Sequence, residues 1–169
     1  LSEMAAIGLQ PDGSVCRRGF SAEDVAGRAL LARWMNEAGL QVRIDTAGNL
    51  IGRLQGLDPD RPALMTGSHL DTVPTGGRFD GVLGVLAGLE VCRSLQDNSI
   101  LLQHDLELIA FADEESTMVG CKGMAGTASC DPKAYATSNR EPIEDNLARI
   151  GGHWPSLVSA RRSDDACAA

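Results

Sequence analysis

The fold of this chain is decided by residues 63–89, which read ALMTGSHLDTVPTGGRFDGVLGVLAGL. The stretch starts with a short apolar run, residues 63–66, that predicts a buried strand. A polar segment rich in glycine follows, and a helix is expected to begin near Asp80. The apolar residues of this helix recur at the i, i+3, i+4 and i+7 spacing of one helical face. They are Val82, Val85, Leu86 and Leu89.

Helices and strands alternate on both sides of this stretch. Ser21, followed by acidic residues, predicts the start of a helix, and Gly39 predicts its end. The glycines between residues 120 and 126 predict a loop or a loosely packed segment, and residues 153–169 show no clear period. The order of elements predicts an α/β fold in which helices pack on both faces of a mixed β-sheet. Further strands are expected at residues 42–44, 50–54 and 106–112, and a short helix at 143–150.

The length and composition exclude several classes of protein. A chain of 169 residues is long enough for one domain with a sizeable core. Its formal net charge of −8 argues against a nucleic-acid partner and against docking on an anionic membrane, both of which require basic clusters. The absence of a long apolar run predicts no membrane-spanning helix. Five cysteines at irregular spacing predict free thiols in a reducing compartment, hence a cytoplasmic location.

Two polar clusters follow predicted strands and contain the residues that could do chemistry. His69 and Asp71 are two residues apart, so on extended backbone they point to the same side, where a carboxylate can orient an imidazole. Asp80 lies in the glycine-rich turn. Glu114 and Glu115 are adjacent, so one can bind a metal while the other moves protons. Nitrogen and oxygen donors without a nearby cysteine suit zinc or manganese.

Each of these residues has a simpler explanation when it is taken alone. A single histidine is more often a satisfied core or surface residue, an aspartate before a helix is more often an N-cap, and an acidic pair is more often a solvated loop. Ligands in open α/β sheets bind beyond the carboxyl ends of the strands, where both clusters are expected. From the residues alone, a metal site and its absence both remain open.

Residues 67–74 (GSHLDTVP) and 76–85 (GGRFDGVLGV) resemble the signature of the M20-type zinc amidohydrolases. More narrowly, they are similar to the branch of allantoate amidohydrolases, N-carbamoyl-L-amino-acid hydrolases and ureidoglycolate hydrolases. Residues 111–115 (FADEE) resemble the second block of the family, and residues 21–24 and 45–52 resemble its leading segment. The resemblance covers nearly the whole chain.

The resemblance implies a zinc-exopeptidase-like catalytic domain and a role for each candidate residue. His69 would be a ligand of one metal ion, Asp71 would orient it, and Asp80 would bridge two divalent ions, zinc or manganese. Glu114 would be the general base and Glu115 a metal ligand. The implied activity is hydrolysis of linear ureido or amide C–N bonds in small anionic metabolites, such as allantoate or N-carbamoyl amino acids.

The sequence departs from the family pattern in two ways. Residues 116–118 (STM) stand where the family usually has glycine and an Arg-Phe-like step. Two further histidine ligands of the family are missing from residues 1–169. The chain is therefore expected to be the N-terminal part of a longer enzyme, incomplete and inactive by itself. The lid domain, which would form a homodimer, and the C-terminal part of the catalytic domain would be absent from it.

The sequence also permits two other functions and contains several other residues that could bind a ligand or react. The alternatives are a dipeptidase or aminoacylase of the same family, and a non-catalytic binding module that retains part of the fold. His104 is expected at the surface, and His153 is a weak candidate for a substitute ligand. The pair at 161–162 (RR) is expected to be solvated, although it could bind a carboxylate. Cys121 and Cys130 are expected to be inert because no histidine partner is placed beside them.

Overall fold

The computed structural model describes residues 1–163, 167 and 168, and the described strands form one mixed sheet. The strand order is β1-β2-β4-β3-β5. Neighbours β1 and β2, and β2 and β4, are antiparallel, whereas β3 is parallel to both β4 and β5. The mixed sheet predicted from the sequence is confirmed. The strands are β1 Gln41–Ile44, β2 Leu50–Leu54, β3 Ala63–His69, β4 Leu106–Phe111 and β5 Cys167–Ala168.

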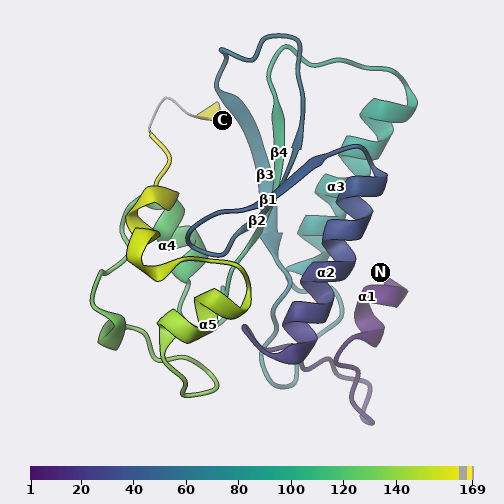
Figure 1. Ribbon diagram of the computed structural model, residues 1–169. Helices are drawn as coiled ribbons and strands as arrows, with labels where there is room; N and C mark the ends of the chain where they lie inside the picture. The colour runs from purple at the N-terminus through teal and green to yellow at the C-terminus, as the bar shows by residue number, and fades with distance from the viewer. Residues whose placement is uncertain (164–166, 169) are drawn as a thin grey trace.

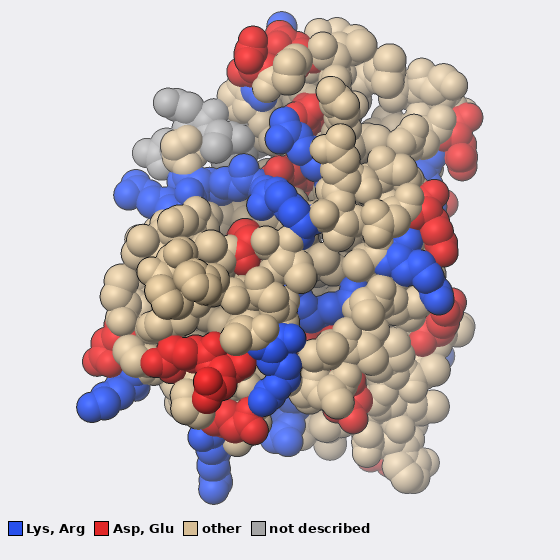
Figure 2. Space-filling view, viewed as in Figure 1, with Lys and Arg blue, Asp and Glu red and all other residues tan. Residues whose placement is uncertain are grey.

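Helices lie on both sides of this sheet, as predicted (Figure 1). One side holds α1, α2 and α3, and the other holds α4, α5 and η2. The bounds of the α-helices are α1 Ser2–Ala6, α2 Ala22–Glu37, α3 Val82–Asp97, α4 Val119–Ala125 and α5 Ile143–Arg149. Two short 3₁₀ helices are η1 Pro132–Ala134 and η2 Trp154–Ala160. On the face shown in Figure 2, basic side chains form a band at the upper left, and a group of acidic side chains lies at the lower left.

The larger hydrophobic core lies between the sheet and the helices α2 and α3. Leu31 of α2 and Val85 of α3 are fully buried there against Leu108 of β4. The glycines of α3 allow a close approach, since a Cβ atom at Gly88 would lie 2.6 Å from a methyl carbon of Leu108. A smaller cluster on the opposite face joins Met124 of α4 to the sheet. Both faces of the sheet therefore contribute to burial, and β4 is buried along nearly its whole length.

The structure corrects the sequence-based prediction in two segments that border the site. A helix, α4, occupies the segment expected to be a loop, because its glycines are contact points: a Cβ atom at Gly123 would lie 2.5 Å from the Cβ of Ala47. Strand β3 continues three residues past the apolar run, because backbone pairing with β4 extends to the partners His69 and Phe111. A 3₁₀ helix, η2, also forms in the segment that shows no sequence period.

Two predictions from composition can be compared with the described residues. In that part of the chain, no helix has the length and apolar character needed to cross a membrane. The four cysteines with described side chains are free thiols, whereas the side chain of Cys167 lies outside the described set. Those four are Cys16, Cys92, Cys121 and Cys130.

Candidate metal centre

The parallel pairing of β3 and β4 places the two polar clusters next to each other. His69 is the last residue of β3, and its partner across the ladder is Phe111, the last residue of β4. The chain leaves β4 through Ala112 and Asp113 and reaches the pair Glu114 and Glu115. Both clusters therefore lie at the same carboxyl edge of the sheet, as predicted.

The imidazole of His69 and the carboxylates of Glu114 and Glu115 converge on one point. One ligand atom from each of the three residues lies within 4.8 Å of the other two. His69 Nε2 lies 3.6 Å from a carboxylate oxygen of Glu114. The His69 side chain is 11% exposed and that of Glu114 is 36% exposed, so the group opens toward solvent on the glutamate side. One nitrogen and two oxygen donors gathered in this way form a group that could hold a metal ion.

Asp80 lies at the edge of this group rather than within it. Its side chain is exposed, and it is not one of the three converging residues. Burial raises the pKa of Glu115, and the negative charges of Asp80 and Glu114 and a hydrogen bond with Asp80 raise it further. The Asp80 carboxylate therefore lies beside that of Glu115. Like charges held together in this way are stabilised by a cation.

Asp71 contacts both clusters, but not in the way that its spacing from His69 suggests. Its carboxylate oxygen lies 3.6 Å from His69 Nδ1, whereas its backbone carbonyl oxygen lies 2.9 Å from that nitrogen. Because a carbonyl oxygen only accepts hydrogen bonds, this contact places the proton on Nδ1 and leaves the lone pair of Nε2 free for a metal. The imidazole is thus oriented by the backbone of Asp71.

The side chain of Asp71 instead holds the glutamate pair. Its two carboxylate oxygens accept the backbone N–H groups of Glu114 at 3.2 Å and Glu115 at 3.0 Å. Asp71 is 2% exposed, and burial, together with the charges of Asp24 and Asp113, raises its pKa to about 6. One residue therefore fixes the imidazole relative to both glutamates.

A glycine with positive φ brings helix α3 next to the histidine. Gly81 has φ = 64° and precedes the first residue of α3. A Cβ atom at this position would lie 2.5 Å from Cε1 and Nδ1 of the His69 ring. Glycine is therefore required there both by the backbone conformation and by the ring. The same turn places Asp80 beside the site.

Two buried polar residues that support the site, Arg17 and Asn49, were not predicted from the sequence. The guanidinium of Arg17 is 0% exposed and donates a hydrogen bond of 2.8 Å to the carbonyl of Leu70, between His69 and Asp71. Asn49 lies within a segment quoted for the family resemblance, but its residue type and position alone indicate no chemical role. The contacts of both residues bridge distant parts of the chain, so no local pattern predicts them.

A cleft of about 140 Å³ adjoins the candidate centre. Asp71 and Glu115 line it on the side of the metal group, and Arg18 and Ser138 line it elsewhere. A larger set of polar atoms than the three converging side chains is therefore available beside the site. This cleft beside the three converging side chains is a candidate binding pocket.

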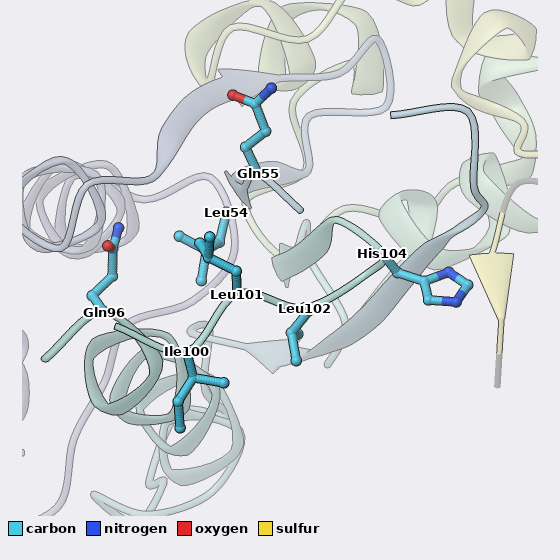
Figure 3. A pocket seen from close by; sticks show the side chains of 7 residues that line it. All are labelled: Leu54, Gln55, Gln96, Ile100, Leu101, Leu102 and His104. Carbon is cyan, nitrogen blue, oxygen red and sulfur yellow. The ribbon is translucent and has the colours of Figure 1, made fainter. Parts of the chain in front are cut away.

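The remaining histidines lie away from the centre. His104 is half-buried, with Nδ1 2.7 Å from the carbonyl oxygen of Pro62, and it precedes β4 at the opposite end of that strand. It borders a cavity of about 20 Å³, too small for a substrate, and its ring points away from Gln96 and Leu101 (Figure 3). His153 is exposed, with Nδ1 3.0 Å from Ser156 Oγ.

The two arginines near the end of the described chain differ in environment. Arg161 is exposed, as expected. Arg162 is not a solvated residue, because it forms an ion pair with the buried carboxylate of Glu107 on the sheet. Arg43 also pairs with this carboxylate, at 3.2 Å. The expectation of a solvated basic pair is therefore wrong for Arg162.

The chain is similar to known hydrolases over most of its length. N-carbamoyl-L-amino acid amidohydrolase of Geobacillus stearothermophilus is 47% identical over 148 residues, which cover 85% of this chain and 36% of that protein. Ureidoglycolate hydrolase of Arabidopsis thaliana is 33% identical over 163 residues, 96% of this chain and 33% of that protein. The chain thus spans about a third of the length of these relatives.

The fold agrees with a solved structure from the same group. The crystal structure of a hydantoinase/carbamoylase family amidase from Burkholderia ambifaria superimposes with a TM-score of 0.84 at 39% identity. The match covers 90% of this chain and 39% of that one. The profile of a family described as Peptidase family M20/M25/M40 matches residues 65–153, more than half of the chain, including every candidate site residue. The chain belongs to peptidase family M20/M25/M40.

Proposed function

We propose that this chain is the metal-binding part of an amidohydrolase that cleaves linear C–N bonds of carbamoyl or ureido groups in small anionic metabolites. The substrates would be compounds such as N-carbamoyl amino acids or allantoate. The observation that carries the proposal is the convergence of His69, Glu114 and Glu115 within 4.8 Å. The names of the similar amidohydrolase and ureidoglycolate hydrolase support the substrate class.

His69, Asp80 and Glu115 would hold the metal, with Asp80 shared between two divalent ions, zinc or manganese. The free Nε2 of His69 and the adjoining carboxylates of Asp80 and Glu115 support this assignment. When bound, such an ion supplies Lewis acidity, which polarises a carbonyl group and lowers the pKa of water. The ring of His69 is held by the Asp71 carbonyl, so its lone pair does not have to be oriented when the ion binds.

Glu114 would act as the general base. Its side chain is partly exposed, it lies 3.6 Å from His69 Nε2, and its backbone is held by the Asp71 carboxylate. In this position Glu114 would accept a proton from the attacking water and then deliver it to the leaving nitrogen. A positioned acid–base group of this kind contributes roughly 10²–10⁴ to the rate. Asp71 would orient His69 through its backbone carbonyl and Glu114 through its carboxylate.

The proposed enzyme is larger than residues 1–169. The similar amidohydrolase is nearly three times as long as the matched segment, so we propose that this chain is the N-terminal part of the catalytic domain. The remaining ligands and a lid domain, which would form a homodimer, would come from further sequence. Residues 1–169 alone would bind metal weakly and would not turn over substrate. We propose a reducing, cytoplasmic location for the enzyme, in line with its free cysteines.

The two glutamates can be distinguished by matched substitutions. Glu114→Gln should leave the metal content nearly intact and lower turnover of the full-length enzyme by roughly 10²–10⁴. Glu115→Gln should lower metal affinity, because a charged oxygen donor becomes a neutral amide. Glu90→Gln is the control, since the Glu90 side chain is 71% exposed on α3. Metal lost in Glu114→Gln but kept in Glu115→Gln would show that the roles are reversed.

The substrate class is tested with the full-length enzyme by ammonia release. Ammonia from N-carbamoyl amino acids or allantoate, with no cleavage of dipeptides, would support the proposal. Cleavage of dipeptides alone would favour the second candidate, a dipeptidase, which the family description also covers. Metal binding without either reaction would favour a binding module. Ammonia production by residues 1–169 alone would contradict the proposal that this part is inactive.

A further inference from the structure

We propose that Asn49 is a positioning residue that sets the loop from the end of β4 to the first residue of α4 (residues 113–119), on which Glu114 and Glu115 lie. The inference rests on the proposed function only in so far as those glutamates serve a metal site. Asn49 is 0% exposed and follows the turn between β1 and β2, so it belongs to a different part of the sheet. It is neither one of the three converging residues nor one of the residues that line the cleft.

The side chain of Asn49 joins the two ends of this loop. Its Oδ1 accepts the backbone N–H of Ala112 at 3.1 Å, at the start of the loop. Its Nδ2 donates to the carbonyl oxygen of Gly120 at 3.0 Å, at the end of the loop. The two ends also pair directly, since the N–H of Gly120 donates to the carbonyl of Ala112 at 3.1 Å. Of the three hydrogen bonds that join Ala112 and Gly120 directly or through Asn49, two belong to Asn49.

Hydrogen bonds with Asp45 fix the orientation of the Asn49 side-chain amide. One carboxylate oxygen of Asp45 accepts the second hydrogen of Asn49 Nδ2 at 2.8 Å. The other accepts the backbone N–H groups of Ala47 at 3.0 Å and Asn49 at 2.9 Å. Because a carboxylate only accepts, the amide nitrogen must face Asp45 and the amide oxygen must face Ala112. An asparagine supplies the donor and the acceptor that the two ends of the loop require.

The closed loop determines where the glutamates can lie. Glu114 and Glu115 follow Ala112 by two and three residues, so a shift at Ala112 moves both. Inside the loop, the Asp71 carboxylate holds their N–H groups, and Asp113 accepts the N–H of Thr117 at 3.0 Å. Small displacements of ligand-bearing backbone weaken a metal site, and supporting residues of this kind are worth about 10–100-fold in affinity.

The first test is amide hydrogen exchange in the absence of metal, on Asn49→Asp and on the double variant Asp45→Asn/Asn49→Asp. Asn49→Asp keeps the acceptor for Ala112 but sets a carboxylate against Asp45 and the Gly120 carbonyl. The double variant restores the 45–49 pair with reversed polarity and leaves only the contact with Gly120 lost. Asn36→Asp is the matched control, because the Asn36 side chain is exposed on α2 and donates to the carbonyl of Ala32 in its own helix.

We expect the backbone amides of Glu114 and Glu115 to exchange at least about tenfold faster in Asn49→Asp than in wild type. In the double variant, global stability should recover, but these two amides should still exchange faster than in wild type. Asn36→Asp should exchange as wild type. A uniform rise over the whole domain, or no change at the two glutamates, would overturn the proposal. If no variant folds, hydrogen exchange of the wild-type protein tests the proposal. Similar opening free energies at Ala112, Glu114, Glu115 and Gly120 would support a loop held by Asn49, and much weaker protection of the two glutamates would overturn it.

The second test measures Co²⁺ binding by absorption spectroscopy on the full-length enzyme carrying the same substitutions, in the variants that fold. We expect about tenfold weaker binding and an altered spectrum in the double variant, with no change in Asn36→Asp. Unchanged Co²⁺ affinity in the double variant would overturn the positioning role. If the variants show faster exchange at the glutamates but the wild-type enzyme binds no Co²⁺, the role of Asn49 in holding the loop is supported and the proposed metal site is refuted. Failure of the positioning role and failure of the metal site are therefore distinguishable.

Discussion

Replacement of Gly120 by alanine is a sharp test, because helix propensity and tertiary contacts act on it in opposite directions. Gly120 is the second residue of α4. Alanine is more favourable than glycine within a helix by about 1 kcal/mol, so propensity alone predicts that Gly120→Ala stabilises the protein. The tertiary structure predicts the opposite sign, because a methyl group at Gly120 would overlap Asn49 Oδ1 and the nitrogen of Ala112.

The expected loss follows from the contacts that the methyl group would break. Because non-bonded heavy atoms pack at about 3.5 Å, the loop or the helix must move by roughly 1 Å. This movement breaks the hydrogen bonds of Gly120 to Asn49, at 3.0 Å, and to Ala112, at 3.1 Å. Each is worth about 0.5–1.5 kcal/mol, and a buried group left without a partner costs about 1–3 kcal/mol. We expect Gly120→Ala to lower the free energy of unfolding by about 2–4 kcal/mol in total.

Urea unfolding of wild type, Gly120→Ala and Gly77→Ala measures this loss. Gly77 is exposed, and a Cβ atom there would meet no heavy atom within 4 Å. The same chemical change at Gly77 should therefore alter stability by no more than about 0.5 kcal/mol. If Gly120→Ala is as stable as Gly77→Ala, or more stable, the close packing of α4 against Asn49 and the end of β4 is refuted.

Three further outcomes are expected. Leu108 in β4 is 0% exposed, so Leu108→Ala should lower the free energy of unfolding by about 2–5 kcal/mol. Leu83 is 51% exposed, so Leu83→Ala should change it little. Equal effects of the two substitutions in urea titrations would contradict the placement of the core. Burial raises the pKa of Asp24 above 3.8. A raised folded-state pKa contributes stability that is present below the unfolded-state pKa and is lost as pH rises through the folded-state pKa. The stability of Asp24→Asn relative to wild type should therefore increase from about pH 4 upward, and a stability difference that is independent of pH would contradict this prediction. Zn²⁺ or Mn²⁺ should raise the midpoint of thermal unfolding and a chelator should reverse the rise; His69→Ala should abolish it and His104→Ala should keep it, and a rise that survives His69→Ala would place the metal elsewhere.

Local patterns in the sequence were sufficient for the elements that place the site. The apolar run before Gly67 and the helical spacing of Val82, Val85 and Leu89 follow from burial, which requires apolar residues at the period of each element. These residues form β3 and α3, and the three named valine and leucine side chains are buried. The shared edge of the two polar clusters also follows from sequence, because the carboxyl ends of parallel strands in α/β sheets lie on one side.

Only the tertiary structure decided which groups the site residues contact. The Asp71 carboxylate holds the backbone of Glu114 and Glu115, 43 and 44 residues further along the chain. Asn49 clamps Ala112 and Gly120, which are 63 and 71 residues away. Hydrogen bonds between such distant segments leave no periodic trace in the sequence, since each depends on one side chain and on the three-dimensional path of the backbone. For the same reason the glycines of α4 suggested a loop, whereas the folded chain uses them to bring a helix against the end of β4.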